Sequence, residues 1–208
     1  MKYVKVLGLL AVASAALMAF TASASAATLT SPTGTTYTGT ISASGTKPTL
    51  DGSFTTVTCL KSTVEGKVEQ HGVSATVAGK ISKLTFEECN FPVTVIKLGS
   101  LELHAINNPV AGQAHSTCST GNDMCTGTLT SVGAEVTVAT SVGTCTFSTG
   151  AGTSVGVVTP TGDTGGTGVI DIGSSPIPRT GGNFLCGSSA TWTGSYTVNT
   201  PHNFWIDH

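Results

Sequence analysis

The feature that most constrains the fold of this chain is an alternation of residue types with a period of two. The segment FLCGSSATWTGSYTVNT (184–200) shows it most clearly. Its second face carries mostly Thr and Ser, whereas the first holds Cys186, Ser188, Ala190, Trp192, Gly194, Tyr196 and Val198. Because successive side chains of a strand point to opposite sides, this pattern predicts a strand with one buried and one solvated face.

The same period recurs along most of the chain. Residues 35–44 alternate Thr with Tyr37, Gly39 and Ile41. The clearest hairpin joins CLKSTVEGKVE to GVSATVAGKI, with a turn at residues 70–72 that contains His71. Further short runs follow, separated by Gly, Pro and Asn, and no window after the leader has helical periodicity with good helix formers.

About ten short strands with frequent turns predict an all-β protein, an antiparallel β-sandwich that is Ig-like or jelly-roll-like and stapled by disulfides. An outer-membrane barrel also alternates, but it needs aromatic girdles and a continuous apolar outer face. Twelve aromatic residues in 208 make that alternative less favourable. The expected organisation is one β-sandwich domain over 27–208, preceded by a leader at 1–26.

The leader has the form of a secretory signal peptide. Lys2 and Lys5 precede an apolar stretch at 6–20, and small residues at Ala24 and Ala26 predict cleavage after Ala26. A membrane anchor is the alternative, but the apolar stretch is shorter than the roughly 20 residues of a spanning helix. The expected localisation is secreted and extracellular, without a membrane anchor.

Charge is scarce and unevenly distributed. Without Lys2 and Lys5, seven cationic residues face 11 acidic ones, so we expect no nucleic-acid partner. Twelve of these 18 charges lie between Lys47 and Glu102. This shift indicates either two subdomains or one domain with a charged and a neutral side; without a Pro-rich or Ser-rich linker, we prefer one domain.

All six cysteines lie after the leader. An even number in an oxidising compartment predicts three disulfides, and the lack of a CxxC motif argues against a metal site. Sequence permits 15 connectivities. The expected one is sequential, and pairs Cys59 with Cys89, Cys118 with Cys125 and Cys145 with Cys186.

Two aromatic residues are expected to act as a core pillar. Trp192 and Tyr196 share a face with Cys186, and a buried Trp beside a disulfide is familiar from immunoglobulin domains. We therefore predict that Trp192 is buried next to a Cys145–Cys186 bridge, with the Thr face exposed.

The sequence gives only weak evidence for catalytic residues. GTSVG (152–156) matches a nucleophile elbow with Ser154, and Asp171 and His202 follow in the right order. The helix that an elbow requires is absent from the sequence that follows, so a turn between strands is expected. Glu87 and Glu88 face opposite ways in a strand, and Glu87 could meet Glu102 across strands as a carboxylate pair. No catalytic residue or cofactor is therefore predicted.

The tail PHNFWIDH (201–208) has two interpretations. His202, Asp207 and His208 are metal-ligand types, but residue type alone is weak, and no metal site is predicted. Phe204, Trp205 and Ile206 favour a last strand or a cap over one end of the fold, with an intermolecular contact as the alternative. His104 and His115 have no partner that the sequence can name.

The run FLCGSSATWTGSYTV, with TCTFSTG upstream and TCLKSTVEGKV and GKISKLTFEEC earlier, resembles a family of uncharacterised secreted Cys-containing, Gly/Thr-rich β proteins from high-GC Gram-positive bacteria. The likeness covers residues 50–205 and implies no reaction. A second likeness, in the Thr-Ser-Pro-Thr-Gly start and the Cys-linked strands, is to secreted activators of alkane oxidation.

The first expectation is a non-enzymatic, secreted structural or surface-interaction protein, with self-association or cell-surface contact as its mode of action. The alternative is a carrier or contact factor for apolar small molecules, which would need an apolar cavity. A hydrolase is a distant third.

Overall fold

The computed structural model describes residues 27–31, 34–53, 55–71, 76–105, 125–141, 143–160 and 167–207, apart from the side chains of residues 70 and 71. Besides Cys125, which has 3-10 geometry, the chain in these ranges forms strands and the short 3-10 helix η2. They are β1 (Thr28–Thr30), β2 (Thr40–Gly52), β3 (Thr56–His71), β4 (Thr76–Cys89), β5 (Val93–Lys97), β6 (Ser100–Ala105), β7 (Gly127–Val132), β8 (Glu135–Thr140), β9 (Gly143–Ser148), β10 (Thr153–Thr159), β11 (Val169–Gly181), η2 (Phe184–Cys186), β12 (Ser189–Thr200) and β13 (Trp205–Asp207).

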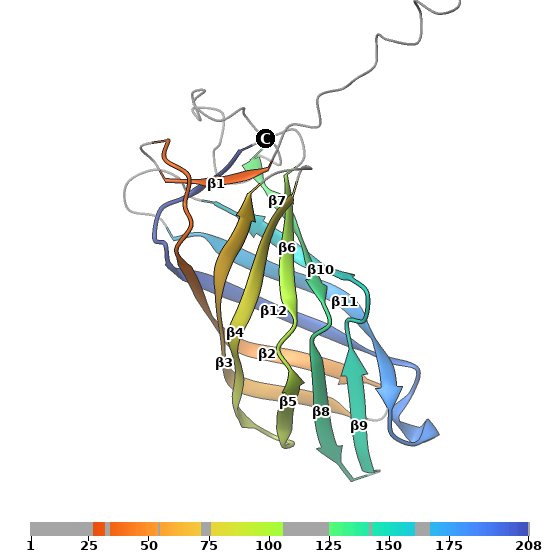
Figure 1. Ribbon diagram of the computed structural model, residues 1–208. Helices are drawn as coiled ribbons and strands as arrows, with labels where there is room; N and C mark the ends of the chain where they lie inside the picture. The colour runs from red at the N-terminus through yellow and green to blue at the C-terminus, as the bar shows by residue number, and fades with distance from the viewer. Residues whose placement is uncertain are drawn as a thin grey trace, which may run out of the picture.

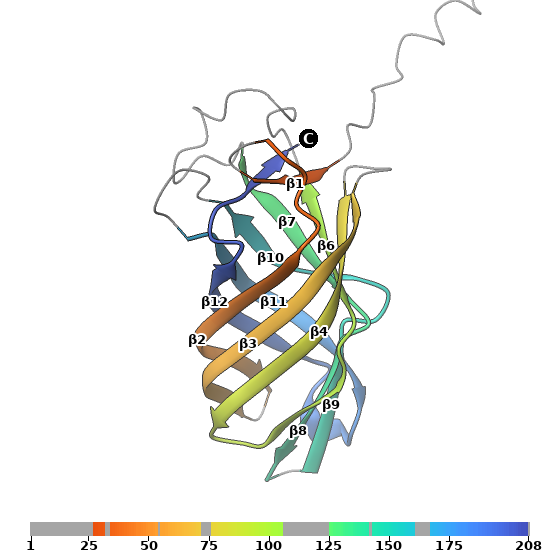
Figure 2. The ribbon, with the colours of Figure 1, turned by 60° about the vertical axis from the view of Figure 1, so that its left-hand side comes forward.

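Eight of the strands close into an antiparallel barrel. The order around the ring is β10-β7-β6-β4-β3-β2-β12-β11, and a pairing between β10 and β11 closes it. The closing contact is short, because it joins only Val157–Thr159 of β10 to Val169–Asp171 of β11. Figures 1 and 2 show this barrel in the upper part of the molecule, with β1 lying across its upper end.

Below the barrel, the long strands continue into a second region. After a β-bulge between Ile172 and Ser175, β11 leaves β10 and pairs with β9 at Arg179 and Gly181. Strands β8 and β5 follow β9 in the same sheet. Figure 1 shows the β8–β9 hairpin at the lower end of the molecule.

The alternation seen in the sequence decides which side chains face inward. On β12, Ala190, Tyr196 and Val198 are buried, whereas Thr193 and Thr197 are exposed. The expected Thr-rich outer face is therefore present. The pairing of β3 with β4 is also confirmed, but the turn expected at residues 70–72 is placed too early. Strand β3 continues through His71, which lies opposite Val77 in the register. Residues 72–75 lie outside the described residues.

The all-β, antiparallel and disulfide-linked part of the expectation is confirmed, but the upper region is a closed barrel where a sandwich, Ig-like or jelly-roll-like, was expected. The physical reason is the β10–β11 pairing, which joins the two edges that a sandwich would leave open. The charged and neutral parts of the sequence form two sides of one ring, since β2, β3, β4 and β6 are contiguous and so are β7, β10, β11 and β12.

Candidate ligand cavity

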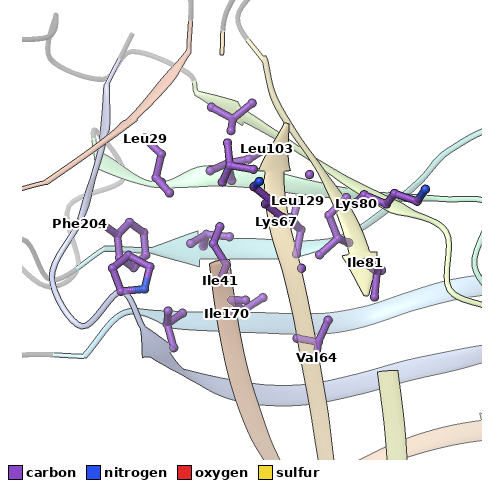
Figure 3. Close-up of a pocket in the computed structure, with 18 residues that line it drawn as sticks. Leu29, Ile41, Val64, Lys67, Lys80, Ile81, Leu103, Leu129, Ile170 and Phe204 are labelled. Atoms are coloured by element: carbon purple, nitrogen blue, oxygen red, sulfur yellow. The ribbon is translucent and has the colours of Figure 1, made fainter. Parts of the chain in front are cut away.

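An apolar cavity of about 90 Å³ lies inside the upper part of the barrel. Figure 3 shows the labelled side chains of Ile41, Val64, Ile81, Leu103, Leu129 and Ile170 gathered from different strands around it. The lining consists of Leu29, Ile41, Val64, Gly66, Lys67, Val68, Val77, Gly79, Lys80, Ile81, Leu101, Leu103, Leu129, Val158, Ile170, Val198, Pro201 and Phe204. An interior of eight strands is wide enough either to be filled by side chains or to hold one small ligand. In this protein the inward side chains leave part of the barrel interior unfilled.

The cavity is covered at its upper end by the two termini of the described chain. Strands β1 and β13 pair with each other, and Leu29 and Phe204 from this part of the chain line the cavity. Thr30 Oγ1 donates a hydrogen bond of 2.6 Å to Asp207 Oδ2, and both residues are buried. Of the expected last strand or cap, both are present: Trp205 and Ile206 lie in β13, and Phe204 precedes this strand and lines the cavity.

Three smaller apolar cavities continue from this one toward the lower end. The second, of about 40 Å³, shares Val64, Ile81 and three other lining residues with the first. The third, of about 50 Å³, shares Leu84, Ala134 and Trp192 with the second. The fourth, of about 20 Å³, shares Leu50, Val57 and Phe147 with the third. The interior thus holds a series of neighbouring apolar voids that share lining residues.

Trp192 stands between the second and third voids. Its ring meets Phe86 and Tyr196 edge to face, with centroids 6.2 Å away in both cases. Its Nε1 is buried and makes no hydrogen bond of normal geometry, although its residue as a whole is only partly buried. An indole N–H held in an apolar interior is a hydrogen-bond donor without an acceptor.

Tyr196 lies deeper, with 2% of its surface exposed. Its phenol donates a hydrogen bond of 3.1 Å to Ser62 Oγ. Burial raises the pKa of Tyr196 to about 12, and the neighbouring Ser62 hydroxyl and Trp192 indole oppose that rise. Tyr196 therefore remains a neutral phenol at any physiological pH.

Two of the expected disulfides are present, Cys59–Cys89 and Cys145–Cys186. Cys125 is also disulfide-bonded; its expected partner, Cys118, lies outside the described residues. Trp192 is only partly buried, where full burial was predicted, and it does not line the void that Cys145 and Cys186 line. Cys186 belongs to η2, which precedes β12, so the alternation does not extend back from Ala190 to Cys186. Trp192 instead lines the same void as Cys59.

The residues considered for catalysis do not come together. Ser154 is the second residue of β10 and lies five residues before Thr159, which is about 16 Å along a strand. His202 instead follows the upper end of β12. Asp171 is the register partner of Val157. GTSVG forms the start of a strand after a turn at Gly150–Gly152 rather than an elbow. Glu87 pairs in register with Lys61, and Glu102 with Ala78, so the two carboxylates are not opposite each other; Glu88 forms an ion pair with Lys61 at 3.9 Å.

The sequence does not predict one polar cluster, which is formed by Thr76, His104 and Glu102. His104 Nδ1 lies 3.2 Å from Thr76 Oγ1, and its Nε2 lies 3.8 Å from Glu102 Oε2. A hydroxyl, an imidazole and a carboxylate in series suit acyl transfer, but 3.8 Å is too long for a hydrogen bond. Neither Thr76 nor His104 lines any of the four voids. The contact depends on the β4–β6 register, for which a separation of 28 residues leaves no sequence signal.

The tail also contains the residues considered as metal ligands. Asp207 is occupied by Thr30, and His208 and His115 lie outside the described residues. No group of three or more potential metal ligands occurs in the part of the chain that the structure describes.

Comparisons of the chain with family models, with curated proteins and with solved structures find no match. Among the described residues, no helix has the length and apolar character needed to cross a membrane.

Proposed function

We propose that this protein is an exported binding protein that holds a small apolar molecule, or the apolar end of a larger one, inside its barrel. The observation that carries the proposal is the 90 Å³ void, whose lining is apolar except for Lys67 and Lys80. Ligand sites are concave and largely apolar, and an eight-stranded barrel is a common container for one small ligand.

The size of the void sets the class of ligand. An engineered apolar cavity of about 150 Å³ stays dry and takes up benzene or xenon. A void of about 90 Å³ therefore suits a segment of a few carbon atoms. A longer chain would continue into the next void of about 40 Å³, because the two share five lining residues. A linear alkyl group fits this series of narrow voids better than a fused ring does.

Among the functions expected from the sequence, we favour the carrier of apolar small molecules, with its ligand held inside the barrel. Export is supported by the leader and by the disulfides, which persist in oxidising compartments. The likeness to uncharacterised secreted Gly/Thr-rich proteins, and to activators of alkane oxidation, remains a hypothesis that agrees with an apolar ligand. Catalysis is no part of the proposal.

Binding can be tested with n-octane and the mature, oxidised protein. Native mass spectrometry of the secreted protein reports any molecule carried from the producing cell, and thermal unfolding reports stabilisation by added octane. We expect saturable stabilisation by octane. Absence of both a bound molecule and a stabilising effect would refute the proposal.

Matched variants locate the site. Val158 lines the void and Val157, its neighbour on β10, is 41% exposed on the outer face. Val158→Phe should reduce octane affinity at least about tenfold, since one filled void removes the burial of several methylenes, and Val157→Phe should not. If Val158→Phe proves poorly folded, Leu103→Ala serves instead, because it enlarges the void and should increase the stabilisation by larger apolar probes. Equal affinity in all three variants would exclude this void as the site.

A further inference from the structure

The second void, of about 40 Å³, is lined by three side chains that carry a polar atom, and only one of these lacks a hydrogen-bond partner. Ser131 Oγ lies 3.2 Å from Thr149 Oγ1, and the Tyr196 phenol donates to Ser62. The third side chain is Trp192, whose Nε1 is buried. No group among the described residues accepts a hydrogen bond of normal geometry from it. Buried polar groups are nearly always hydrogen-bonded in native proteins, so this donor needs an acceptor from elsewhere.

The N–H of Trp192 lies on the side of the second void. Trp192 lines both the second and the third void, whereas Tyr196 lines the second and not the third. Burial raises the pKa of Tyr196 to about 12, and the Trp192 N–H opposes this rise, as a donor close to the phenol oxygen does. The two rings nevertheless meet edge to face, and no hydrogen bond of normal geometry joins them. The N–H is therefore close to Tyr196 and can donate to an acceptor placed in the second void.

The second void adjoins the main cavity of about 90 Å³. The two share five lining residues, which are Val64, Ile81, Leu101, Leu129 and Ile170. Figure 3 shows Val64 and Ile170 low in the view, below Leu29 and Leu103. An alkyl chain that spans both spaces passes between the shared side chains. A molecule with one end beside Trp192 can therefore place its alkyl chain in the main cavity.

The surroundings of Trp192 favour a neutral polar group over a charged one. None of the residues that line the second void is Asp, Glu, Lys, Arg or His. Lys67 and Lys80 line the main cavity, but both are exposed and lie opposite each other on β3 and β4, where they alternate with the buried Val68 and Ile81. A carboxylate buried beside Trp192 would have no cation to pair with, which carries a large cost.

We propose that the ligand is a linear alkyl compound with a neutral oxygen group, such as a ketone, an aldehyde or an alcohol, whose oxygen accepts a hydrogen bond from Trp192 Nε1. This inference rests on the proposed function and adds the chemical class of the ligand, which is an oxygenated compound rather than a hydrocarbon. A single polar group in an otherwise apolar pocket fixes the orientation of a ligand. Trp192 is therefore a specificity-determining residue, which holds the oxygen in the second void while the alkyl chain lies in the main cavity.

The experiment compares n-octane with 2-octanone, which has a chain of the same length and one added carbonyl oxygen. Headspace partitioning over the mature, oxidised protein measures the Kd of both volatile compounds. Because 2-octanone loses more hydration than octane, the informative quantity is the ratio of its Kd to that of octane, compared between protein variants. Trp192→Phe keeps an aromatic ring and removes the N–H. The ratio should therefore rise at least about tenfold, as expected for the loss of one buried hydrogen bond.

Trp205→Phe is the matched control. Trp205 is buried in β13 and lines none of the four voids, so the same chemical change there should leave the Kd ratio of the parent protein unaltered. Octanoate at neutral pH should not compete with 2-octanone. Competition by octanoate that Lys67→Met abolishes would assign the polar end of the ligand to the lysines and overturn the proposal.

Proton NMR of the parent protein observes the indole directly, even if Trp192→Phe folds poorly. The chain has two tryptophans, and Trp205→Phe assigns their two indole N–H resonances. We expect 2-octanone to move the Trp192 resonance farther downfield than octane does. Binding of 2-octanone without this shift, or an equal Kd ratio in Trp192→Phe and the parent protein, would overturn the proposal and leave binding in the barrel intact. If neither compound binds, the proposed function fails and this inference fails with it.

Discussion

Replacement of Tyr196 by Phe tests whether the interior depends on its single buried phenol. The phenol oxygen and Ser62 Oγ are 3.1 Å apart, and the two residues are 2% and 1% exposed. Tyr196→Phe removes the donor and leaves the Ser62 hydroxyl in a dry interior, where an unsatisfied polar group costs about 1–3 kcal/mol. We expect a loss of about 2 kcal/mol in the free energy of unfolding.

The Tyr196–Ser62 pair can be tested more sharply with a double-mutant cycle. Ser62→Ala strands the Tyr196 hydroxyl and should cost a similar amount, but the double variant leaves no polar group behind. Its loss should therefore be smaller than the sum of the single losses by about 1–2 kcal/mol. Urea unfolding of the oxidised proteins, followed by far-UV circular dichroism, measures all four corners of the cycle. Strict additivity would show that the hydrogen bond contributes nothing to stability.

Three other outcomes are expected. Burial raises the pKa of Tyr196 to about 12, against about 10 in the unfolded chain. The contribution of Tyr196 to stability should therefore be constant below pH 10 and fall by about 2–3 kcal/mol as the pH rises toward 12. The difference between the urea midpoints of the parent and Tyr196→Phe across this range measures this loss. Trp192→Ala, which removes both edge-to-face contacts, should cost about 3 kcal/mol in the same assay. Asp207→Asn weakens the buried bond from Thr30 and should accelerate hydrogen exchange of the β13 amides, while those of β3 keep their protection.

The strands were predictable because their determinant is local. On β12, the inward residues Ala190, Tyr196 and Val198 follow directly from the period of two, and so does the exposed Thr face. The β3–β4 hairpin was also predictable from the sequence, because a short turn limits the pairing of the two strands to one register. The Cys59–Cys89 bridge joins residues opposite each other in that hairpin, so the sequential pairing agrees with the strand register.

Closure of the barrel was not predictable, because it depends on contacts between distant segments. The β10–β11 pairing involves three residue pairs and ends where β11 bulges between Ile172 and Ser175. Nothing in the alternation distinguishes a strand that continues in a flat sheet from one that bends toward a new neighbour. The alternation also stops at η2, so it does not relate the face that carries Trp192 to Cys186.

The apolar cavity of about 90 Å³ depends on the backbone of its wall as well as on the side chains that line it. Gly66 and Gly79 line it from β3 and β4, where a larger residue would fill the space. Neither can be enlarged without moving the strands, because a Cβ on Gly66 would lie 2.8 Å from Lys80 O and one on Gly79 would lie 3.2 Å from Lys67 O. The β3–β4 pairing therefore excludes side chains from this part of the wall. Filling the void therefore requires a larger side chain at another lining position, such as Val158 of β10, and Val158→Phe tests whether the space is used.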